Sequence, residues 1–178
     1  MKMVKTVMAG AVAMALVSFG ANAADQGSGV VNFKGKVIDA PCGIAPESVD
    51  QSIDFGQISK SHLNGGGISV QKNVDIKLVN CDLSDTVKYP NKKVTVAFTG
   101  NAGTPATELL TAGGTGTAVV VNGYGADVNF TGTPTAGISI VDGSNTLHFS
   151  SWVKKAANAT AVTEGDFTAV TNFTLAYN

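Results

Sequence analysis

The sequence predicts an all-β fold, a sandwich of short strands, and two observations indicate it. Runs that alternate between apolar and polar residues recur along the chain, whereas the 3.6-residue period of an amphipathic helix is almost absent. Clusters of Gly, Asn, Pro and Thr separate these runs, as at 64–67, 100–105 and 112–116. Seven or more short strands at this spacing favour two packed sheets of the immunoglobulin type.

The first residues are expected to be a signal peptide rather than part of the fold. Lys2 and Lys5 precede an apolar run at 7–19, and Ala21-Asn22-Ala23 then supplies a small-x-small cleavage pattern. The run is shorter than the roughly 20 residues that span a bilayer, so a retained membrane anchor is the weaker alternative. Removing these 23 residues from the 178 leaves a mature chain of 155, which we expect to be exported.

Export determines how the two cysteines are interpreted. Cys42 and Cys81 both lie in the mature chain, and an oxidising compartment favours a disulfide between them. A metal site would need nearby histidine or carboxylate ligands, and His62 and His148 are far apart in sequence, so neither metal nor cofactor is expected. On the chain-entropy model, closing this loop stabilises the fold by roughly 4 kcal/mol.

The expected strands of the body follow from their alternation. One helical turn is expected at 58–63 and no other helix. The residues expected on the apolar faces of the strands are, in chain order, Val70, Val74, Ile76 and Leu78; Val94, Val96 and Phe98; 119–121; Val128 and Phe130; Ile138 and Ile140; and Leu147, Phe149, Ser151 and Val153.

The C-terminal residues form a long alternating run that opens at Gly165 and continues to the end of the chain. A strand this apolar on one face has to be covered, because an open edge invites aggregation. The strand pattern by itself favours an ordinary interpretation, in which this run is the last strand of a closed sandwich. Its apolar face carries Phe167, Ala169, Thr171, Phe173, Leu175 and Tyr177.

A second alternating segment precedes the first cysteine. A glycine at an alternating position suits a place where a partner's backbone or a large side chain comes close. An ordinary first strand with a frayed tail is the alternative. One face carries Gly27, Gly29, Val31, Phe33, Gly35 and Val37, and the other carries Ser28, Val30, Asn32, Lys34 and Lys36.

Composition and motifs exclude several classes of function. The chain has 12 lysines, no arginine and 13 acidic residues, a formal net charge of −1, so it lacks the residue and the positive charge that nucleic-acid binding selects. No Gly-x-Ser-x-Gly elbow or pair of catalytic carboxylates stands out, and no enzyme is expected. Asp82 and Asp85 fit a solvated turn. Trp152 and Tyr124 could stack on a sugar, but Trp152 falls in an expected strand.

Several motifs together resemble the chaperone–usher pilins of Gram-negative bacteria, with the nearest likeness to the rod subunits of P pili. The resemblance covers essentially the whole mature chain. Besides the signal peptide, it rests on Ala40-Pro41-Cys42, Leu78-Val79-Asn80-Cys81, the run from Gly165 to Asn178, and the stretches 51–57, 113–118 and 162–165.

The resemblance implies an incomplete immunoglobulin-like sandwich that lacks its last strand. A periplasmic chaperone lends a strand to the groove beside the C-terminal strand, and at an outer-membrane usher the N-terminal extension of the next subunit replaces it. The implied parts are a signal peptide at 1–23, a donor segment at 24–36 and the pilin domain at 37–178. Gly165 and the six residues of the C-terminal face would form the groove edge.

The donor segment implied by the resemblance would present Gly27, Gly29, Val31 and Phe33. Gly29 is the best match to the family's obligatory small residue, although a slip of two residues would place Gly27 there. The sequence thus predicts a non-enzymatic major fimbrial subunit at the cell surface. Its expected partners are other copies of itself, the chaperone, the usher and adaptor or tip subunits. A minor adaptor or terminator subunit, or a secreted sandwich that binds a small ligand, is the alternative.

Overall fold

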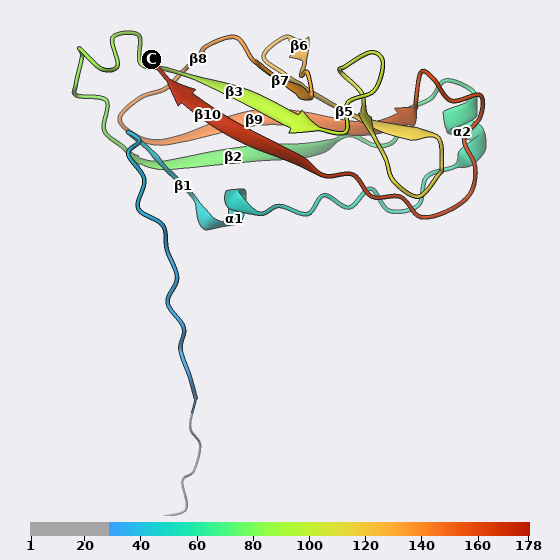
Figure 1. Ribbon diagram of the computed structural model, residues 1–178, viewed down its shortest axis with the longest axis horizontal. Helices are drawn as coiled ribbons and strands as arrows, with labels where there is room; N and C mark the ends of the chain where they lie inside the picture. The colour runs from blue at the N-terminus through green and yellow to red at the C-terminus, as the bar shows by residue number, and fades with distance from the viewer. Residues whose placement is uncertain (1–28) are drawn as a thin grey trace, which may run out of the picture. The chain divides into compact units, whose positions relative to one another are not determined.

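The computed structural model describes residues 29–178, so the expected signal peptide and Gly27 lie outside the described residues. The described part divides into the stretch that ends at Lys36 and the domain Val37–Asn178. Residues 29–36 belong to no helix or strand. The domain is built from strands and two short helices (Figure 1). No helix of the described part is long and apolar enough to cross a membrane.

Most strands of the domain are antiparallel partners of one another. In chain order the elements are β1 (Gly43–Ile44), α1 (Pro46–Val49), α2 (Lys60–Asn64), β2 (Lys72–Cys81), β3 (Lys93–Gly100), β4 (Leu109–Leu110), β5 (Thr117–Gly123), β6 (Ala126–Asp127), β7 (Thr131–Pro134), β8 (Ile138–Ser139), β9 (Gly143–Lys155) and β10 (Thr171–Tyr177).

The strands form two sheets. The first has the order β1-β2-β9-β5-β4, with β6 paired to β5. The second has the order β10-β3-β7, with β8 paired to β3. Long antiparallel registers hold the centre of each sheet, Ile76 lying opposite Leu147 in the first and Phe98 opposite Phe173 in the second. The all-β prediction is therefore confirmed.

One hydrophobic core lies between the sheets, because the alternating strands direct their apolar residues to it. From the first sheet Ile76, Leu78 and Leu147 are at most 1% exposed, and from the second Val94 and Val96 are fully buried. The rings of Phe98 and Phe149 meet edge to face with centroids 5.3 Å apart, and join the two layers.

Three of the local predictions need correction. Val70 was expected on the core face, but β2 begins at Lys72 and Val70 is 77% exposed. Val128 and Phe130 are buried as expected, yet they lie between β6 and β7 rather than in a strand. Their amides donate to carbonyls of two different segments, Val121 and Ala106, so no ladder forms there. The expected C-terminal strand begins at Thr171, six residues later than Gly165.

The helices agree only partly with expectation. The helical turn expected at 58–63 is α2, whose first turn is capped by the Ser59 hydroxyl, which accepts from the His62 amide at 3.4 Å. The helix α1 was not expected. Its sequence signal is Pro46 at the first helical position, where a missing N–H is tolerated. The buried Ser48 hydroxyl then donates to the Asp75 carbonyl and ties α1 to β2.

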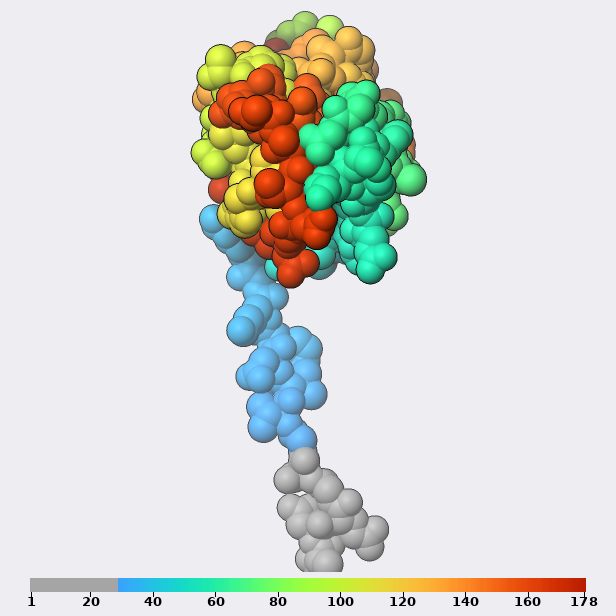
Figure 2. All heavy atoms as spheres, turned by 90° about the vertical axis from the view of Figure 1, so that its right-hand side faces the viewer, coloured from blue at the N-terminus to red at the C-terminus, as the bar shows by residue number. Residues whose placement is uncertain are grey.

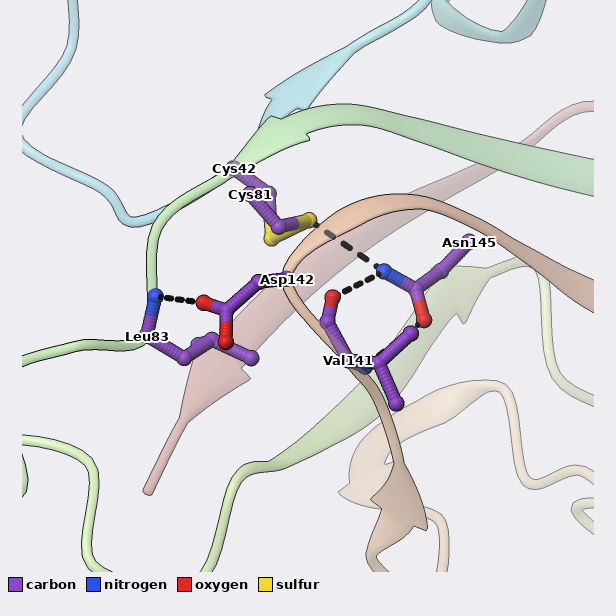
Figure 3. The surroundings of a disulfide bond; sticks show 6 residues. All are labelled: Cys42, Cys81, Leu83, Val141, Asp142 and Asn145. Carbon is purple, nitrogen blue, oxygen red and sulfur yellow. Dashed lines mark hydrogen bonds between the residues drawn. A yellow bond between two sulfur atoms is a disulfide. The ribbon is translucent and has the colours of Figure 1, made fainter.

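The predicted disulfide between Cys42 and Cys81 is present and joins the start of β1 to the end of β2. Side chains from β9 and from the loop before it support the disulfide (Figure 3). Asn145 donates from Nδ2 to the Val141 carbonyl at 2.8 Å, and the same nitrogen lies 3.4 Å from the sulfur of Cys81. Asp142 accepts a 2.6 Å hydrogen bond from the Leu83 amide. The bonded corner is therefore fixed from three chain segments.

Candidate functional site

The strand β10 is the edge of the second sheet, and it pairs only with β3 among the described strands. Asn178 and Lys93 exchange both of their backbone hydrogen bonds, at 2.9 and 3.0 Å. In an antiparallel ladder such pairs alternate, so Asn172, Thr174 and Ala176 also direct their backbone groups to β3. The backbone groups of the four odd-numbered residues of β10 consequently point away from β3 and toward an open edge.

A second open edge faces β10 across the domain. The chain between α1 and α2 belongs to no helix or strand at 51–58, and within the described part these residues form no backbone-to-backbone hydrogen bond. Ile53 and Phe55 are half-buried whereas Ser52 and Asp54 between them are exposed, which is the alternation of a strand. The Gln51 side chain holds this segment to β2 by donating to the Asp75 carbonyl at 3.1 Å.

A groove of about 730 Å³ lies between these two edges. Its floor is the core itself, because buried residues of both sheets line it, among them Phe98, Leu109, Val119 and Val121. The two edges run in opposite directions, as the chain from α1 to α2 and the arrow of β10 show in Figure 1. The groove therefore has an apolar floor and two walls with unpaired backbone groups, the shape and chemistry of a missing strand.

The groove continues toward α2 as a second hollow of about 750 Å³, which shares Ile53, Phe55 and Phe167 with the first. This end is more polar, and it is lined by charged residues from both walls, Asp54, Lys60, Glu164 and Asp166. We call the two hollows together the β10 groove, and this part its acidic end.

Cross-links between three segments hold the acidic end in shape. Figure 2 shows the segments side by side: the orange-red chain after β9 lies between the green chain around α2 and the yellow chain before β5. Lys60 lies 2.6 Å from the Glu164 carboxylate. The Asn64 side chain bonds to both the amide and the carbonyl of Val162. The Thr163 amide donates to the Thr115 carbonyl at 3.0 Å. These bonds anchor the chain that leads into β10.

A cluster of threonine hydroxyls lies beneath the acidic end. The Oγ1 atoms of Thr111 and Thr115 both lie 2.8 Å from that of Thr117, and Thr111 Oγ1 also donates to the Thr117 carbonyl at 3.0 Å. Thr115 and Thr117 are almost fully buried. Because each hydroxyl finds a partner inside the cluster, the polar groups are buried at little cost.

The structure brings most of the predicted groove residues to this site. Phe167, Phe173, Leu175 and Tyr177 are half-buried and pack against the core, and the Phe173 ring lies 6.4 Å from that of Phe98, centroid to centroid. Burial raises the pKa of the Tyr177 hydroxyl to about 12, and the neighbouring Tyr89 adds to the shift.

The other predicted groove residues lie at the same wall with different exposure. Thr171 is half-buried and lines the groove, whereas Ala169 lines it but is exposed. Gly165 lines the acidic end at φ +147°, a backbone conformation that favours glycine. The wall at 50–58 was not predicted as part of the site, although the alternation of Ile53 and Phe55 could have indicated it.

The predicted donor residues are accessible where they are described. Val31 is 74% exposed and Phe33 is 92% exposed. No atom lies within 4 Å of the position that a side chain would take at Gly29. Large apolar side chains at such exposure indicate a surface that a partner covers.

The remaining candidate residues have ordinary structural partners. Asp82 accepts from the Ser84 amide at 3.0 Å and so forms the predicted turn. Hydrogen bonding from the Ser84 side chain, and secondly from this amide, lowers the pKa of Asp82. His148 lies 2.8 Å from Asp75 on the outer face of the first sheet. The described residues contain no group of His, Cys, Asp and Glu that could hold a metal ion.

Comparisons with known proteins agree with this geometry. The family model described as "Fimbrial protein" matches residues 31–178. The Pap fimbrial major pilin protein of Escherichia coli is 53% identical over 185 residues, 98% of this chain and all of the relative. The fimbria A protein of Serratia marcescens is 42% identical over 99% of both chains.

Solved structures extend the agreement to the fold. A crystal structure of the P pilus rod subunit PapA superposes with a TM-score of 0.75 at 46% identity, covering 78% of this chain and all of that one. A solved chaperone–usher pilus gives a TM-score of 0.80 at 48% identity, over 86% of this chain and 97% of that one. The incomplete immunoglobulin-like sandwich expected from the sequence is thus confirmed. The chain belongs to the fimbrial protein family.

Proposed function

We propose that this chain is the major structural subunit of a bacterial surface fimbria, and that copies join head to tail. Residues 24–36 of one copy would fill the β10 groove of the next and supply its missing strand. One observation carries the proposal: a groove with an apolar floor lies between two walls of unpaired backbone, in a chain that also carries an exposed alternating segment.

The energetics favour such an insertion. Each large apolar side chain that moves from water into the groove contributes roughly 1.5–3 kcal/mol, and Val31 and Phe33 both start from high exposure. The backbone groups at Thr171, Phe173 and Leu175 would gain partners along the inserted strand. Main-chain bonds then supply affinity, while alternate side chains supply specificity.

The same pairing explains a filament rather than a closed assembly. The inserted segment and the groove are different surfaces of one chain, so the contact is heterologous. A heterologous contact whose rotation does not close continues indefinitely. A chain with both surfaces intact therefore suits the middle of a rod.

An empty groove would need a temporary partner before assembly. Its apolar floor and open backbone edges invite aggregation, which a bound strand from another protein prevents. A periplasmic chaperone that lends such a strand, an outer-membrane usher that exchanges it, and adaptor or tip subunits at the filament end are the partners we propose. The weakly charged surface, without arginine, offers nothing for a nucleic acid.

Removal of the donor segment tests the proposal. The mature chain is prepared with and without Ala24–Gly35, and a peptide of that segment is added to the truncated form. We expect the truncated chain to have a low thermal midpoint, which rises with the logarithm of the peptide concentration once the peptide exceeds its Kd. If the truncated chain is a stable monomer whose unfolding the peptide does not change, the groove is not a strand-binding site.

A second experiment separates a major from a minor subunit. Electron microscopy of cells that lack this chain should show no rods, because the repeating unit is missing. Rods of normal length in those cells would instead identify the chain as an adaptor.

A further inference from the structure

Three short sequences of the chain match the acceptor pattern of N-glycosylation, an asparagine followed two residues later by serine or threonine. They lie at 129–131, 158–160 and 172–174. A pattern this short also occurs by chance, so the sequence alone does not separate an acceptor from an ordinary asparagine. The structure does separate them, because the three asparagine side chains differ in their hydrogen bonds.

The first of these sequences is folded into a tight turn. The side-chain oxygen of Asn129 accepts two hydrogen bonds from Thr131, one from the backbone amide at 2.8 Å and one from the hydroxyl. A backbone amide can only donate, so the atom that it meets is the oxygen Oδ1 of Asn129 and not the nitrogen. The nitrogen Nδ2 is consequently left without a hydrogen-bond partner among the described residues, and it is not buried.

This arrangement prepares Nδ2 to react. The nitrogen of an amide is a poor nucleophile because it shares its lone pair with the carbonyl group. Negative charge develops on the carbonyl oxygen when the nitrogen loses a proton, and hydrogen-bond donors aimed at that oxygen stabilise this charge. Thr131 supplies two such donors to Asn129. The turn therefore eases proton loss from Nδ2 while it leaves this nitrogen free to form a bond.

Buried neighbours fix the turn at the surface. Val128 and Phe130 are at most 4% exposed, and their amides donate to the carbonyls of Val121 and Ala106. Asn129 lies between these two anchors and is half-buried. The folded chain thus holds the asparagine in one position.

A carboxylate stands beside the turn. Asp127 is exposed, and one of its oxygens accepts from the Asn122 amide nitrogen at 2.7 Å. The other oxygen can accept from a basic group of an enzyme. An acidic residue two positions before the asparagine is typical of acceptor sites in bacterial N-glycosylation. The other two sequences carry Ala156 and Val170 at that position.

The other two asparagines also lack the turn. The side chain of Asn158 is exposed, and no hydrogen bond joins it to Thr160 in the part of the chain that the structure describes. Asn172 lies in β10, which its pairing with β3 holds extended. The turn at Asn129 leads into β7, and β3 separates β7 from β10. A group attached to Asn129 would therefore lie across the second sheet from the β10 groove and leave it open.

We propose that Asn129 is an acceptor of an N-linked glycan. The donor is an oligosaccharide whose first sugar is bound to a lipid diphosphate. Nδ2 forms a bond to C1 of this sugar while the bond from C1 to the diphosphate oxygen breaks. The lipid diphosphate leaves with the electron pair of that bond, and the proton of Nδ2 passes to a base of the transferase. This inference goes beyond the proposed function and does not depend on polymerisation.

The experiment uses the full chain, exported by Gram-negative cells that also make a lipid-diphosphate-linked oligosaccharide and an oligosaccharyltransferase facing the periplasm. Mass spectrometry of the intact chain and of its peptides measures the modification. We expect chains that are heavier by one glycan, with the glycan on Asn129 and none on Asn158 or Asn172.

Matched variants distinguish an acceptor from a turn that is only structural. Asn129→Asp keeps an oxygen for both hydrogen bonds from Thr131 and loses only the nitrogen, so this variant should fold and carry no glycan. Thr131→Val keeps the shape of the side chain without its hydroxyl, and it should abolish the modification. Asp127→Asn removes one charge and should reduce the modified fraction several-fold. The thermal midpoint of each variant shows whether it is folded.

The unmodified sequence gives the decisive result, which stands even if a variant fails to fold. Absence of a glycan from Asn129, in cells whose transferase modifies a reporter protein, overturns the proposal. Equal modification of Asn158 or Asn172 overturns it as well, because the turn would then select nothing. An undiminished glycan in a folded Thr131→Val chain shows that the hydroxyl has no part. Absence of filaments would contradict only the proposed function.

Discussion

The ammonium nitrogen of Lys154 lies 2.7 Å from a carboxylate oxygen of Glu108, a residue that is only 1% exposed. The other carboxylate oxygen accepts from the Ala157 amide at 2.8 Å. This contact joins the loop before β4 to the end of β9. The next residue, Leu109, lines the groove, so a buried ion pair supports the floor of the β10 groove from behind.

Replacement of Lys154 by methionine should lower the free energy of unfolding by roughly 3 kcal/mol, because it leaves the Glu108 charge buried without its partner. The value lies at the low end for buried pairs since Lys154 itself is partly exposed. Urea unfolding of the monomer measures it. Lys155→Met is the matched control, and an equal loss there would show that the ion pair contributes nothing.

Loss of the disulfide should destabilise the domain by roughly 4 kcal/mol, because the unfolded chain regains the entropy of an open 39-residue loop. Cys42→Ala with Cys81→Ala is compared with the oxidised chain by thermal unfolding. Asn145→Ala, which removes only the supporting amide, should cost about 1 kcal/mol. An unchanged unfolding midpoint in the double alanine variant would contradict this account.

A leucine at Gly29 should stop polymerisation and leave the monomer intact. The side chain would prevent close approach in the groove of the next copy, whereas within its own chain no atom lies within 4 Å. Gly35→Leu should act in the same way, and Lys34→Leu, on the opposite face, should not. Filament length by electron microscopy and monomer stability by unfolding are measured together. Long filaments of the Gly29 variant would disprove the prediction.

The stability of the monomer should fall as the pH rises from 10 to 12. Burial raises the pKa of Tyr177 to about 12, from an ordinary value of 10. The folded state therefore keeps a proton that the unfolded state releases, and this contribution is complete below pH 10 and lost through that window. Tyr177→Phe removes the contribution, so its unfolding midpoint should fall less steeply with pH. Parallel curves for both proteins would show that the hydroxyl has no such role.

The contribution of the Asp142 carboxylate to the stability of the fold should depend on pH in the acidic range. Hydrogen bonding from the Leu83 amide, and secondly from Lys92, lowers its pKa below 3.8. A lowered pKa stabilises the fold above pH 3.8, and the contribution is lost as the pH falls through the folded pKa. Asp142→Asn should lower the thermal midpoint at pH 6. At pH 3 the midpoints of the variant and the unmodified chain should lie closer together than at pH 6. A constant difference at both pH values would contradict this.

The residues that face the core could be predicted because alternation alone places them. Val94, Val96 and Phe98 are buried on β3, and Leu147 and Phe149 on β9, where one face of a strand must be covered. The disulfide followed from two cysteines in an exported chain. These features depend on local pattern and composition, which a sequence displays directly.

Features that depend on distant partners were missed or misplaced. The wall at 50–58 looks like a loop because no strand among the described residues pairs with it. The start of β10 shifted from Gly165 to Thr171 because β3 ends at Gly100, the partner of Thr171, and no ladder extends beyond it. The buried pair of Glu108 and Lys154 joins positions 46 residues apart, and nothing local marks either residue.

The cross-links at the acidic end have a mechanical consequence. In the proposed filament, tension between neighbouring subunits reaches β10 through the strand inserted beside it, while Asn64 and Lys60 hold the chain that leads into β10. The pull then acts along the strand, perpendicular to its backbone hydrogen bonds. Bonds loaded in this way share the force and must break together, whereas bonds peeled from one end break singly. The rod should therefore withstand drag from flowing liquid at forces that would unzip an ordinary hairpin.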